Sequence, residues 1–376
     1  MEQKSALGYL HNLVQDKKQG FIAIAIKFLL LIGSFFYGLI VRVLILFHSI
    51  SPRRLDCRVI SVGNITWGGT GKTALVEFIA RYLKQKEHKI AILSRGYKKP
   101  DTRYPLPLPA ACLPDRQGRQ GVTRYETMGD EPYMLSKRLS DVPIIVDGDR
   151  IRAAKRAIRD YAVDTVILDD GFQQWKIKKD LEIVAIDANC PFGNKQMIPR
   201  GILREPLSSL RRADAFILTK TNLAANTSDI KDFLNKINSK AIILESIHKP
   251  AGFYRIDNPE ELLSLDILKG KTATLFSGIG DPGSFESLIK NLGLNIGSSF
   301  IFPDHYQYRK EDLDNIVKYS QDKNIEAIIT TEKDAVRIYE LRAKSKSLEI
   351  FVLRIELIIT KDEERFYNRL LRLYSL

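Results

Sequence analysis

Short apolar runs alternate with amphipathic stretches along most of the chain after Pro52. Apolar runs bounded by polar residues predict buried strands, and apolar residues spaced three or four apart predict helices. Repeated strand–helix alternation predicts a mostly parallel sheet that helices cover on both faces. The expected elements are strand Cys57–Val62, helix Thr73–Lys84, strand Ile90–Ser94, helix Glu131–Leu139, strand Pro143–Val146, helix Arg150–Tyr161, and strands Thr165–Leu168, Leu181–Ile186 and Ala215–Leu218.

A second, smaller α/β unit is predicted between Thr272 and Tyr339, where the same alternation resumes. The stretch His248–Asp257 contains proline and glycine and predicts a linker, which the extended run Leu348–Ile359 could join as a second strand. The end of the chain, Asp362–Leu376, predicts an amphipathic helix. The proline-rich segment Lys99–Gly121 predicts a long loop. We therefore expect an N-terminal element in residues 1–52, a domain in residues 53–246 and a domain in residues 247–376.

The N-terminal element is strongly apolar from Gly20 to Phe47, with Lys27 and Arg42 as its only charged residues. Its uncharged core, Phe28–Val41, would span roughly 21 Å as a helix, which is shorter than the hydrocarbon layer of a bilayer. The tract therefore predicts a helix that crosses a membrane marginally or inserts from one side. A buried core helix and a cleaved signal peptide are the alternatives.

Composition adds an acidic partner to this picture. The chain has 58 Lys and Arg against 45 Asp and Glu, a net charge of +13, which suits a nucleotide, a nucleic acid, an anionic lipid or a membrane surface. Its three cysteines are far apart without metal-ligand spacing, which favours a reducing compartment and argues against a structural zinc site.

The segment between the first predicted strand and helix reads GNITWGGTGKT and predicts a P-loop. In such a loop the backbone N–H groups surround a phosphate, a lysine reaches the β- and γ-phosphates, and a hydroxyl group holds Mg²⁺. Lys72 and Thr73 fill the last two roles. The glycine spacing is unusual, because Thr66 stands where a glycine is common. The candidate nucleotide-binding residues are Gly63, Asn64, Ile65, Thr66, Trp67, Gly68, Gly69, Thr70, Gly71, Lys72 and Thr73.

Two pairs of acidic residues are further candidates. Asp169 and Asp170 end a predicted buried strand, as expected for groups that order Mg²⁺ beside a P-loop. Asp130 and Glu131 begin a predicted helix, where acidic residues are also common as caps.

Three weaker signals remain open on residue chemistry alone. His305 lies in a polar and aromatic loop, where a lone histidine is usually structural. The basic clusters Arg200–Arg204 and Arg211–Arg212 would suit phosphate recognition, although solvated charge is the default interpretation. The run AFILTKTN resembles a guanine-reading strand end, but Asn222 replaces its acidic residue, which favours ATP over GTP.

Eight short strings taken together resemble the tetraacyldisaccharide 4'-kinase family, also called lipid A 4'-kinases. They cover nearly the whole chain in the family's order: GNITWGGTGKT (63–73), SRGY (94–97), GDEP (129–132), DGDR (147–150), LDDGFQ (168–173), PRGILREP (199–206), PDHY (303–306) and TEKDAV (331–336). The resemblance implies transfer of the ATP γ-phosphoryl group to the 4'-hydroxyl group of tetraacyldisaccharide 1-phosphate, which forms lipid IVA.

The resemblance also implies partners, cofactors and location. ATP and Mg²⁺ would be the cofactors, and an anionic, membrane-embedded glycolipid would be the acceptor, with no nucleic acid partner. The protein would lie at the bacterial inner membrane with its catalytic domains on the cytoplasmic side. The implied fold is two α/β/α sandwich domains joined by a two-stranded linker, the first of them P-loop NTPase-like, with an N-terminal membrane-associated helix.

Residue roles follow from the resemblance motif by motif. Asp130 would be the general base, with His305 brought across from the second domain to pair with it. Lys72 would act on the phosphates, and the metal side would comprise Thr73, Glu131, Asp169 and Asp170. Further nucleotide-binding residues would be Tyr97, Arg150, Gln173 and Arg204.

Two other functions are compatible with the P-loop alone. A regulatory ATPase without a lipid acceptor would carry the same loop and carboxylates. A nucleic-acid-dependent ATPase would fit the positive charge, but the apolar N-terminal tract argues against it.

Overall fold

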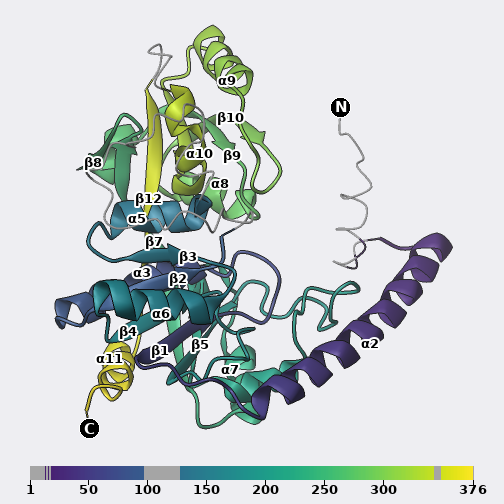
Figure 1. Cartoon of the computed structure of the whole chain (residues 1–376). Helices are drawn as coiled ribbons and strands as arrows, with labels where there is room; N and C mark the ends of the chain where they lie inside the picture. The colour runs from purple at the N-terminus through teal and green to yellow at the C-terminus, as the bar shows by residue number, and fades with distance from the viewer. Residues whose placement is uncertain (1–12, 14–15, 17, 97–127, 343–348, 376) are drawn as a thin grey trace. The chain divides into compact units, whose positions relative to one another are not determined.

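The computed structural model describes residues 13, 16, 18–96, 128–342 and 349–375. The chain forms two compact units (Figure 1). Unit 1 contains Met1–Arg95, Asp149–Ile247 and Ile359–Leu376, and unit 2 contains Gly96–Gly148 and His248–Ile358.

Unit 1 is built on a parallel sheet with the strand order β2, β4, β1, β5, β6, β7. Its central strands are buried along nearly their whole length, which explains why they read as continuous apolar runs. The strand bounds are β1 Arg58–Gly63, β2 Ile90–Ser94, β4 Thr165–Asp169, β5 Leu181–Asp187, β6 Ala215–Thr219 and β7 Ile242–Arg255.

Helices pack on this sheet and on one another. Helix α3 (Lys72–Gln85) contacts β1, β2 and β4, and α6 (Arg150–Tyr161) contacts β2 and β4. The C-terminal helix α11 (Glu363–Leu371) lies against α3, where the Tyr367 and Tyr82 rings stack with centroids 3.9 Å apart. The remaining elements are α7 (Ser228–Ile237) and the short 3₁₀ helices η1 (Leu207–Arg212) and η2 (Thr221–Leu223).

The N-terminal apolar tract forms one continuous helix, α2 (Phe21–Ser49), drawn in purple in Figure 1. Among the described residues it is the helix long and apolar enough to cross a membrane. Most of its large apolar side chains are exposed, while Ser34, Gly38 and Val41 form a narrow buried face at helical spacing. Val41 joins the hydrophobic core of unit 1. The helix is therefore attached along one stripe and uncovered on the rest of its surface.

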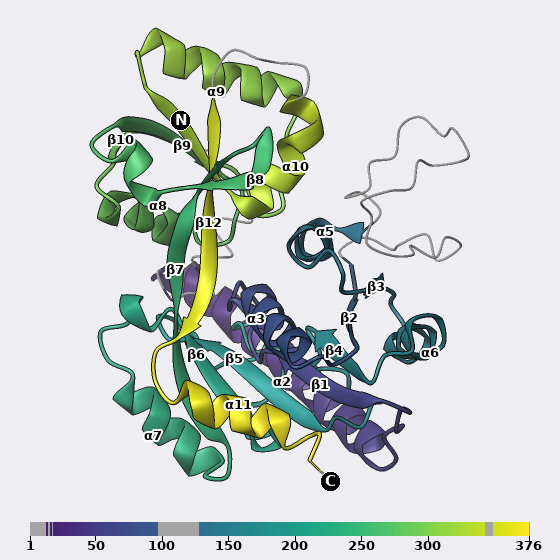
Figure 2. The same ribbon diagram turned by 90° about the vertical axis from the view of Figure 1, so that its left-hand side faces the viewer.

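Unit 2 has its own sheet with the strand order β10, β9, β11, β12, β7, β8. Neighbours among β10, β9, β11 and β12 are parallel, and β8 pairs antiparallel with β7. Figure 2 shows β12 beside β7, and the chain of each strand continues from one unit into the other. The bounds are β8 Asn258–Leu263, β9 Thr272–Ser277, β10 Asn295–Ile301, β11 Ala327–Thr331 and β12 Ile350–Ile359.

Successive residues of the unit 2 strands enter two different hydrophobic clusters, as the two-residue period of a strand requires. Phe351 of β12 packs with α8, whereas Val352 packs with α9 and α10 on the other face. Unit 2 is therefore an α/β/α sandwich. Its helices are α5 (Asp130–Arg138), α8 (Pro282–Asn291), α9 (Lys310–Asp322) and α10 (Glu332–Arg342), and its short elements are β3 (Ile144–Val146) and η3 (Leu265–Leu268).

The predicted α/β class and N-terminal helix are confirmed, and most predicted strands agree with observed ones to within a residue or two. The exception is β7, which begins at Ile242, six residues before the predicted linker stretch His248–Asp257. The grouping of segments differs from the expected domains 53–246 and 247–376. Gly96–Gly148 belongs with unit 2 because α5 packs on α10. Strands β8 and β10 and helix α7 are additional to the elements predicted. The loop expected at Lys99–Gly121 lies outside the described residues.

Candidate active site

The predicted P-loop connects β1 to α3 at the centre of the unit 1 sheet. Gly71 caps α3 with a left-handed φ of 76°, and Gly68 has a φ of 128°, both of which favour glycine. At Gly63 a Cβ atom would lie 2.5 Å from the backbone nitrogen of Phe172. The unusual glycine placement thus has local steric reasons, and the loop directs a helix N-terminus toward its concave side, as a phosphate site requires.

Three backbone contacts hold the P-loop in place. The N–H group of Trp67 donates to the Ile202 carbonyl at 2.7 Å, and the N–H group of Arg204 donates to the Ile65 carbonyl at 2.8 Å. The Thr219 hydroxyl, at the end of β6, donates to the Thr70 carbonyl at 3.0 Å. The loop is therefore fixed from two sides before any ligand binds.

Two cations of unit 1 converge on Asp170. Lys72 Nζ lies 3.5 Å from Asp170 Oδ1, and Arg204 Nη1 lies 2.9 and 3.0 Å from the two carboxylate oxygens. Burial raises the pKa of Asp170, but the charges of Lys72 and Arg204 outweigh burial and lower that pKa below its usual value. Asp170 is therefore ionised and holds the P-loop lysine near the loop.

The oxygen groups expected to hold Mg²⁺ fit that ion. Thr73 lies in the first turn of α3, and Asp169, which is 3% exposed, ends β4 in register with Val62 beside the P-loop. The Ser94 hydroxyl donates to Asp169 Oδ2 at 3.2 Å. With Asp170 these residues supply one hydroxyl and two carboxylates. Mg²⁺ commonly uses one or two carboxylates together with substrate phosphates and water.

Two further predicted residues contact this group. Gln173 Nε2 donates to the Asn64 carbonyl and to Glu205 Oε1, each at 3.1 Å. The buried Arg150 side chain has its Nη2 atom 3.5 Å from the Asp169 carbonyl oxygen. Gln173 therefore supports the start of the P-loop, and Arg150 supports the end of β4.

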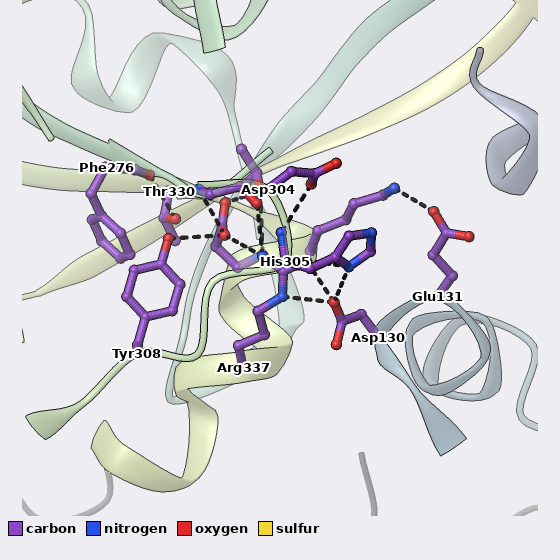
Figure 3. Close-up of polar contacts among 12 residues, drawn as sticks. Asp130, Glu131, Phe276, Asp304, His305, Tyr308, Thr330 and Arg337 are labelled. Atoms are coloured by element: carbon purple, nitrogen blue, oxygen red, sulfur yellow. Dashed lines mark hydrogen bonds and ion pairs between the residues drawn. The ribbon is translucent and has the colours of Figure 1, made fainter. Parts of the chain in front are cut away.

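Unit 2 contains the predicted Asp–His pair. Asp130 begins α5 and is 8% exposed, and its Oδ2 atom lies 3.0 Å from His305 Nδ1 (Figure 3). His305 has a left-handed φ of 59°, and its N–H group is 3.2 Å from the Gly278 carbonyl oxygen. Both residues belong to unit 2, so their pairing requires no contribution from unit 1, in contrast to the expected pairing across two domains.

Arg337 of α10 completes this pair and was not predicted from the sequence. Its Nε and Nη2 atoms lie 2.7 and 2.6 Å from Asp130 Oδ2. Burial raises the pKa of Asp130, but the hydrogen bond from His305 and the charge of Arg337 outweigh burial and lower it. A possible sequence signal is the spacing of Asp334 and Arg337, three residues apart on a helix, which places opposite charges on one face.

Glu131 has a different partner from the one expected. It contacts Lys333 of α10 in unit 2 (Figure 3), whereas the other predicted metal residues, Thr73, Asp169 and Asp170, belong to unit 1. The predicted nucleotide-binding residue Tyr97 lies outside the described residues. Every other predicted site residue belongs either to the P-loop and its neighbours in unit 1 or to the Asp130–His305 pair in unit 2.

Comparison with known proteins identifies the chain's relatives. A family model described as tetraacyldisaccharide-1-P 4'-kinase matches residues 26–375. A tetraacyldisaccharide 4'-kinase of Halothermothrix orenii is 35% identical over 98% of each chain, and one of Elusimicrobium minutum is 39% identical over 82% of this chain and 81% of its own. A crystal structure of "apo" form LpxK from Aquifex aeolicus in complex with ATP is 27% identical, with a TM-score of 0.69 over 93% of this chain and 100% of that chain.

Proposed function

This chain belongs to the tetraacyldisaccharide-1-P 4'-kinase family, and from that premise we propose how its residues perform the reaction. The kinase transfers the γ-phosphoryl group of ATP to the 4'-hydroxyl group of tetraacyldisaccharide 1-phosphate and forms lipid IVA. The observation that carries the proposed residue roles is the 3.0 Å contact between Asp130 and His305. A switch that only hydrolyses ATP needs a P-loop, but it does not need an Asp–His pair to accept a proton from a lipid hydroxyl group.

The residues of unit 1 bind the nucleotide. Backbone N–H groups of the loop from Gly63 to Thr73 and the N-terminus of α3 surround the phosphates. Lys72 moves from Asp170 to the β- and γ-phosphates, and Arg204, which also contacts Asp170, adds positive charge beside them. The Thr73 hydroxyl and the carboxylates of Asp169 and Asp170 would hold Mg²⁺, which would neutralise charge on the phosphates. The proposed nucleotide-binding residues also include Arg150, Gln173 and Tyr97. Glu131 of unit 2 is proposed to act on the metal side.

The residues of unit 2 activate the acceptor. Asp130 and His305 act as one base and accept the proton of the 4'-hydroxyl group while its oxygen attacks the γ-phosphorus atom and the bond to ADP breaks. Asp130 is the general base of this pair: it is ionised beside Arg337, and its contact with His305 holds the carboxylate in place. Transfer therefore needs this pair as well as the P-loop.

The acceptor is an anionic glycolipid, and helix α2 suits a membrane location. Phe21, Phe35 and Phe47 are 88%, 66% and 70% exposed, which places large apolar side chains where acyl chains could cover them. We place α2 in the bacterial inner membrane and both units on the cytoplasmic side, where ATP is available. The membrane surface and the lipid acceptor are the proposed partners, and no nucleic acid is expected.

The proposal is tested by incubating the full chain with radiolabelled ATP and Mg²⁺, with and without tetraacyldisaccharide 1-phosphate. Label should appear on the lipid, and mass spectrometry should show one added phosphate. Acceptor-independent release of phosphate with no labelled lipid would identify a regulatory ATPase instead.

The residue roles are tested with Asp130→Asn and His305→Ala. Each should reduce transfer on the order of 10²-fold or more, the usual contribution of a general base. ATP binding should change little, because neither residue belongs to the P-loop. A variant that keeps near-normal transfer would remove its residue from the proposed base.

A further inference from the structure

Arg337 is an arginine with no exposed side-chain surface in the middle of unit 2. Its Nε and Nη2 atoms donate to Asp130, and its Nη1 atom donates to the Gly278 carbonyl at 2.8 Å and to Asp334 Oδ1 at 3.0 Å. A buried cation is tolerated only when it is paired and hydrogen-bonded. Here one guanidinium group bridges two carboxylates and a backbone carbonyl, which only its rigid fork of donors can do.

Surrounding groups fix the orientation of this guanidinium. Asp334 Oδ1 accepts hydrogen bonds from the Gly278 N–H group at 3.0 Å and from the Tyr308 hydroxyl at 2.9 Å, and Asp334 Oδ2 accepts one from the Thr331 hydroxyl at 2.6 Å. The Gly278 carbonyl also accepts from the His305 N–H group. The same carbonyl group therefore positions both Arg337 and the backbone of His305.

The contacts of His305 Nδ1 restrict where its proton can lie. This nitrogen is 3.0 Å from Asp130 Oδ2 and 3.3 Å from Arg337 Nη2. An arginine side chain only donates, and an ionised carboxylate only accepts. Since the Arg337 charge favours the ionised form of Asp130, the shorter contact is satisfied by a proton on Nδ1. The neutral ring then carries its lone pair on Nε2.

We infer that Arg337 is a positioning residue for the phosphoryl transfer: it holds Asp130 Oδ2 in contact with His305 Nδ1 and so fixes the orientation of both members of the proposed base. This inference rests on the proposed roles of Asp130 and His305. Arg337 itself exchanges no proton and contacts no substrate in this assignment. Its effect on catalysis passes entirely through Asp130.

The assignment predicts a change in kcat without a change in ATP binding. Removing the two Arg337 contacts to Asp130 Oδ2 releases the arrangement in which Asp130 meets His305. The kcat of transfer should therefore fall on the order of 10²-fold, as for other misplaced catalytic groups. The KM for ATP should stay unchanged, because Arg337 does not belong to the P-loop.

Two variants and a matched control test this. Arg337→Lys keeps a charge but cannot bridge Asp130, Asp334 and Gly278 together. The double variant Arg337→Met with Asp334→Asn removes one buried cation and one buried anion, so it guards against misfolding from an unpaired charge. Arg138→Lys is the control: Arg138 is another buried arginine of unit 2, paired with Glu332.

The kcat of phosphate transfer to the lipid and the KM for ATP are measured with the full chain for each variant and for Asp130→Asn, beside its thermal unfolding. A lower kcat with an unchanged KM in both Arg337 variants but not in Arg138→Lys supports the inference. A lower unfolding temperature with an unchanged kcat would show that Arg337 is merely structural and would overturn the inference, with Asp130→Asn still inactive. An active Asp130→Asn would instead overturn the proposed base itself.

Discussion

Replacing Gly63 by alanine is a sharp test of the close approach between the P-loop and the segment that follows β4. Gly63 is the last residue of β1, and an added Cβ atom would lie 2.5 Å from both the backbone nitrogen and the Cβ atom of Phe172. Favourable contacts between carbon atoms occur near ~3.5–4.0 Å. One of the two segments must therefore move by about an ångström.

Neither segment can move freely. The Phe172 side chain is fully buried, and the Arg212 guanidinium lies 4.3 Å from the centre of its ring. The N–H group of the preceding residue, Gly171, donates to the Val62 carbonyl at 3.0 Å. Overpacking of a well-packed core typically costs about 1–3 kcal/mol. For a unit of this size that corresponds to a fall in unfolding temperature of roughly 2–4 °C per kcal/mol.

The displacement should also weaken ATP binding, because Gly63 begins the loop that surrounds the phosphates. Bound ligand at a hundred times its Kd stabilises a protein by about 2.7 kcal/mol, and the variant should gain less at the same ATP–Mg²⁺ concentration. Thermal unfolding with and without ATP–Mg²⁺ measures both effects. Gly69→Ala is the matched control: its Cβ atom would meet nothing within 4 Å, so stability without ATP should stay within about 0.5 kcal/mol. Unchanged stability and unchanged ATP stabilisation in Gly63→Ala would refute the steric account.

Two further perturbations follow from single contacts. Ser34→Ala should destabilise the attachment of α2 by about 1–3 kcal/mol, because the Ser34 hydroxyl donates to the Met197 carbonyl at 2.7 Å and accepts from the Arg200 N–H group at 2.9 Å. Thermal unfolding in detergent measures this loss, and an unchanged unfolding midpoint would contradict the prediction. Arg204→Met should raise the pH of acid unfolding. The pKa of Asp170 is lower in the folded chain than in the unfolded chain, so ion pairing of Asp170 stabilises the fold at pH values above the unfolded-state pKa. That stabilisation is lost as the pH falls through the folded-state pKa. Circular dichroism during acid titration measures the unfolding pH, and an unchanged unfolding pH would mean that Lys72 alone sustains the pairing.

The unit 1 strands could be predicted from sequence because burial on both faces leaves an uninterrupted apolar run. The P-loop could be identified from sequence because its glycines, lysine and threonine lie within one short segment of the chain. Strands β8 and β10 lacked such signals. Asn258–Leu263 contains proline and two acidic residues and is mostly exposed, and Asn295–Ile301 alternates exposed with half-buried positions that include small polar residues. Edge strands commonly carry these features.

The assignment of α5 to unit 2 could not be predicted, because it depends on contacts between distant parts of the sequence. Asp130 bonds to partners 175 and 207 residues away, and Arg138 bonds to Glu332, 194 residues away. Local periodicity identifies a helix but does not specify the sheet it covers. The Asp130–His305 pair was available only from the family resemblance, and Arg337, whose role depends on burial, was not identified at all.

The role of Arg204 shows why a residue's chemistry is set by its neighbours rather than by its type. The basic cluster around it suggested phosphate recognition, yet each part of this residue has a separate contact. Its carbonyl accepts from the Tyr37 hydroxyl of α2 at 3.0 Å, its N–H group donates to the P-loop at Ile65, and its guanidinium binds Asp170. The helix proposed to enter the membrane and the loop proposed to bind ATP are thus held by one residue. A change in how α2 is seated would therefore reach the P-loop through this residue as well as through the hydrophobic core, which contains both Val41 of α2 and Ile65 of the loop.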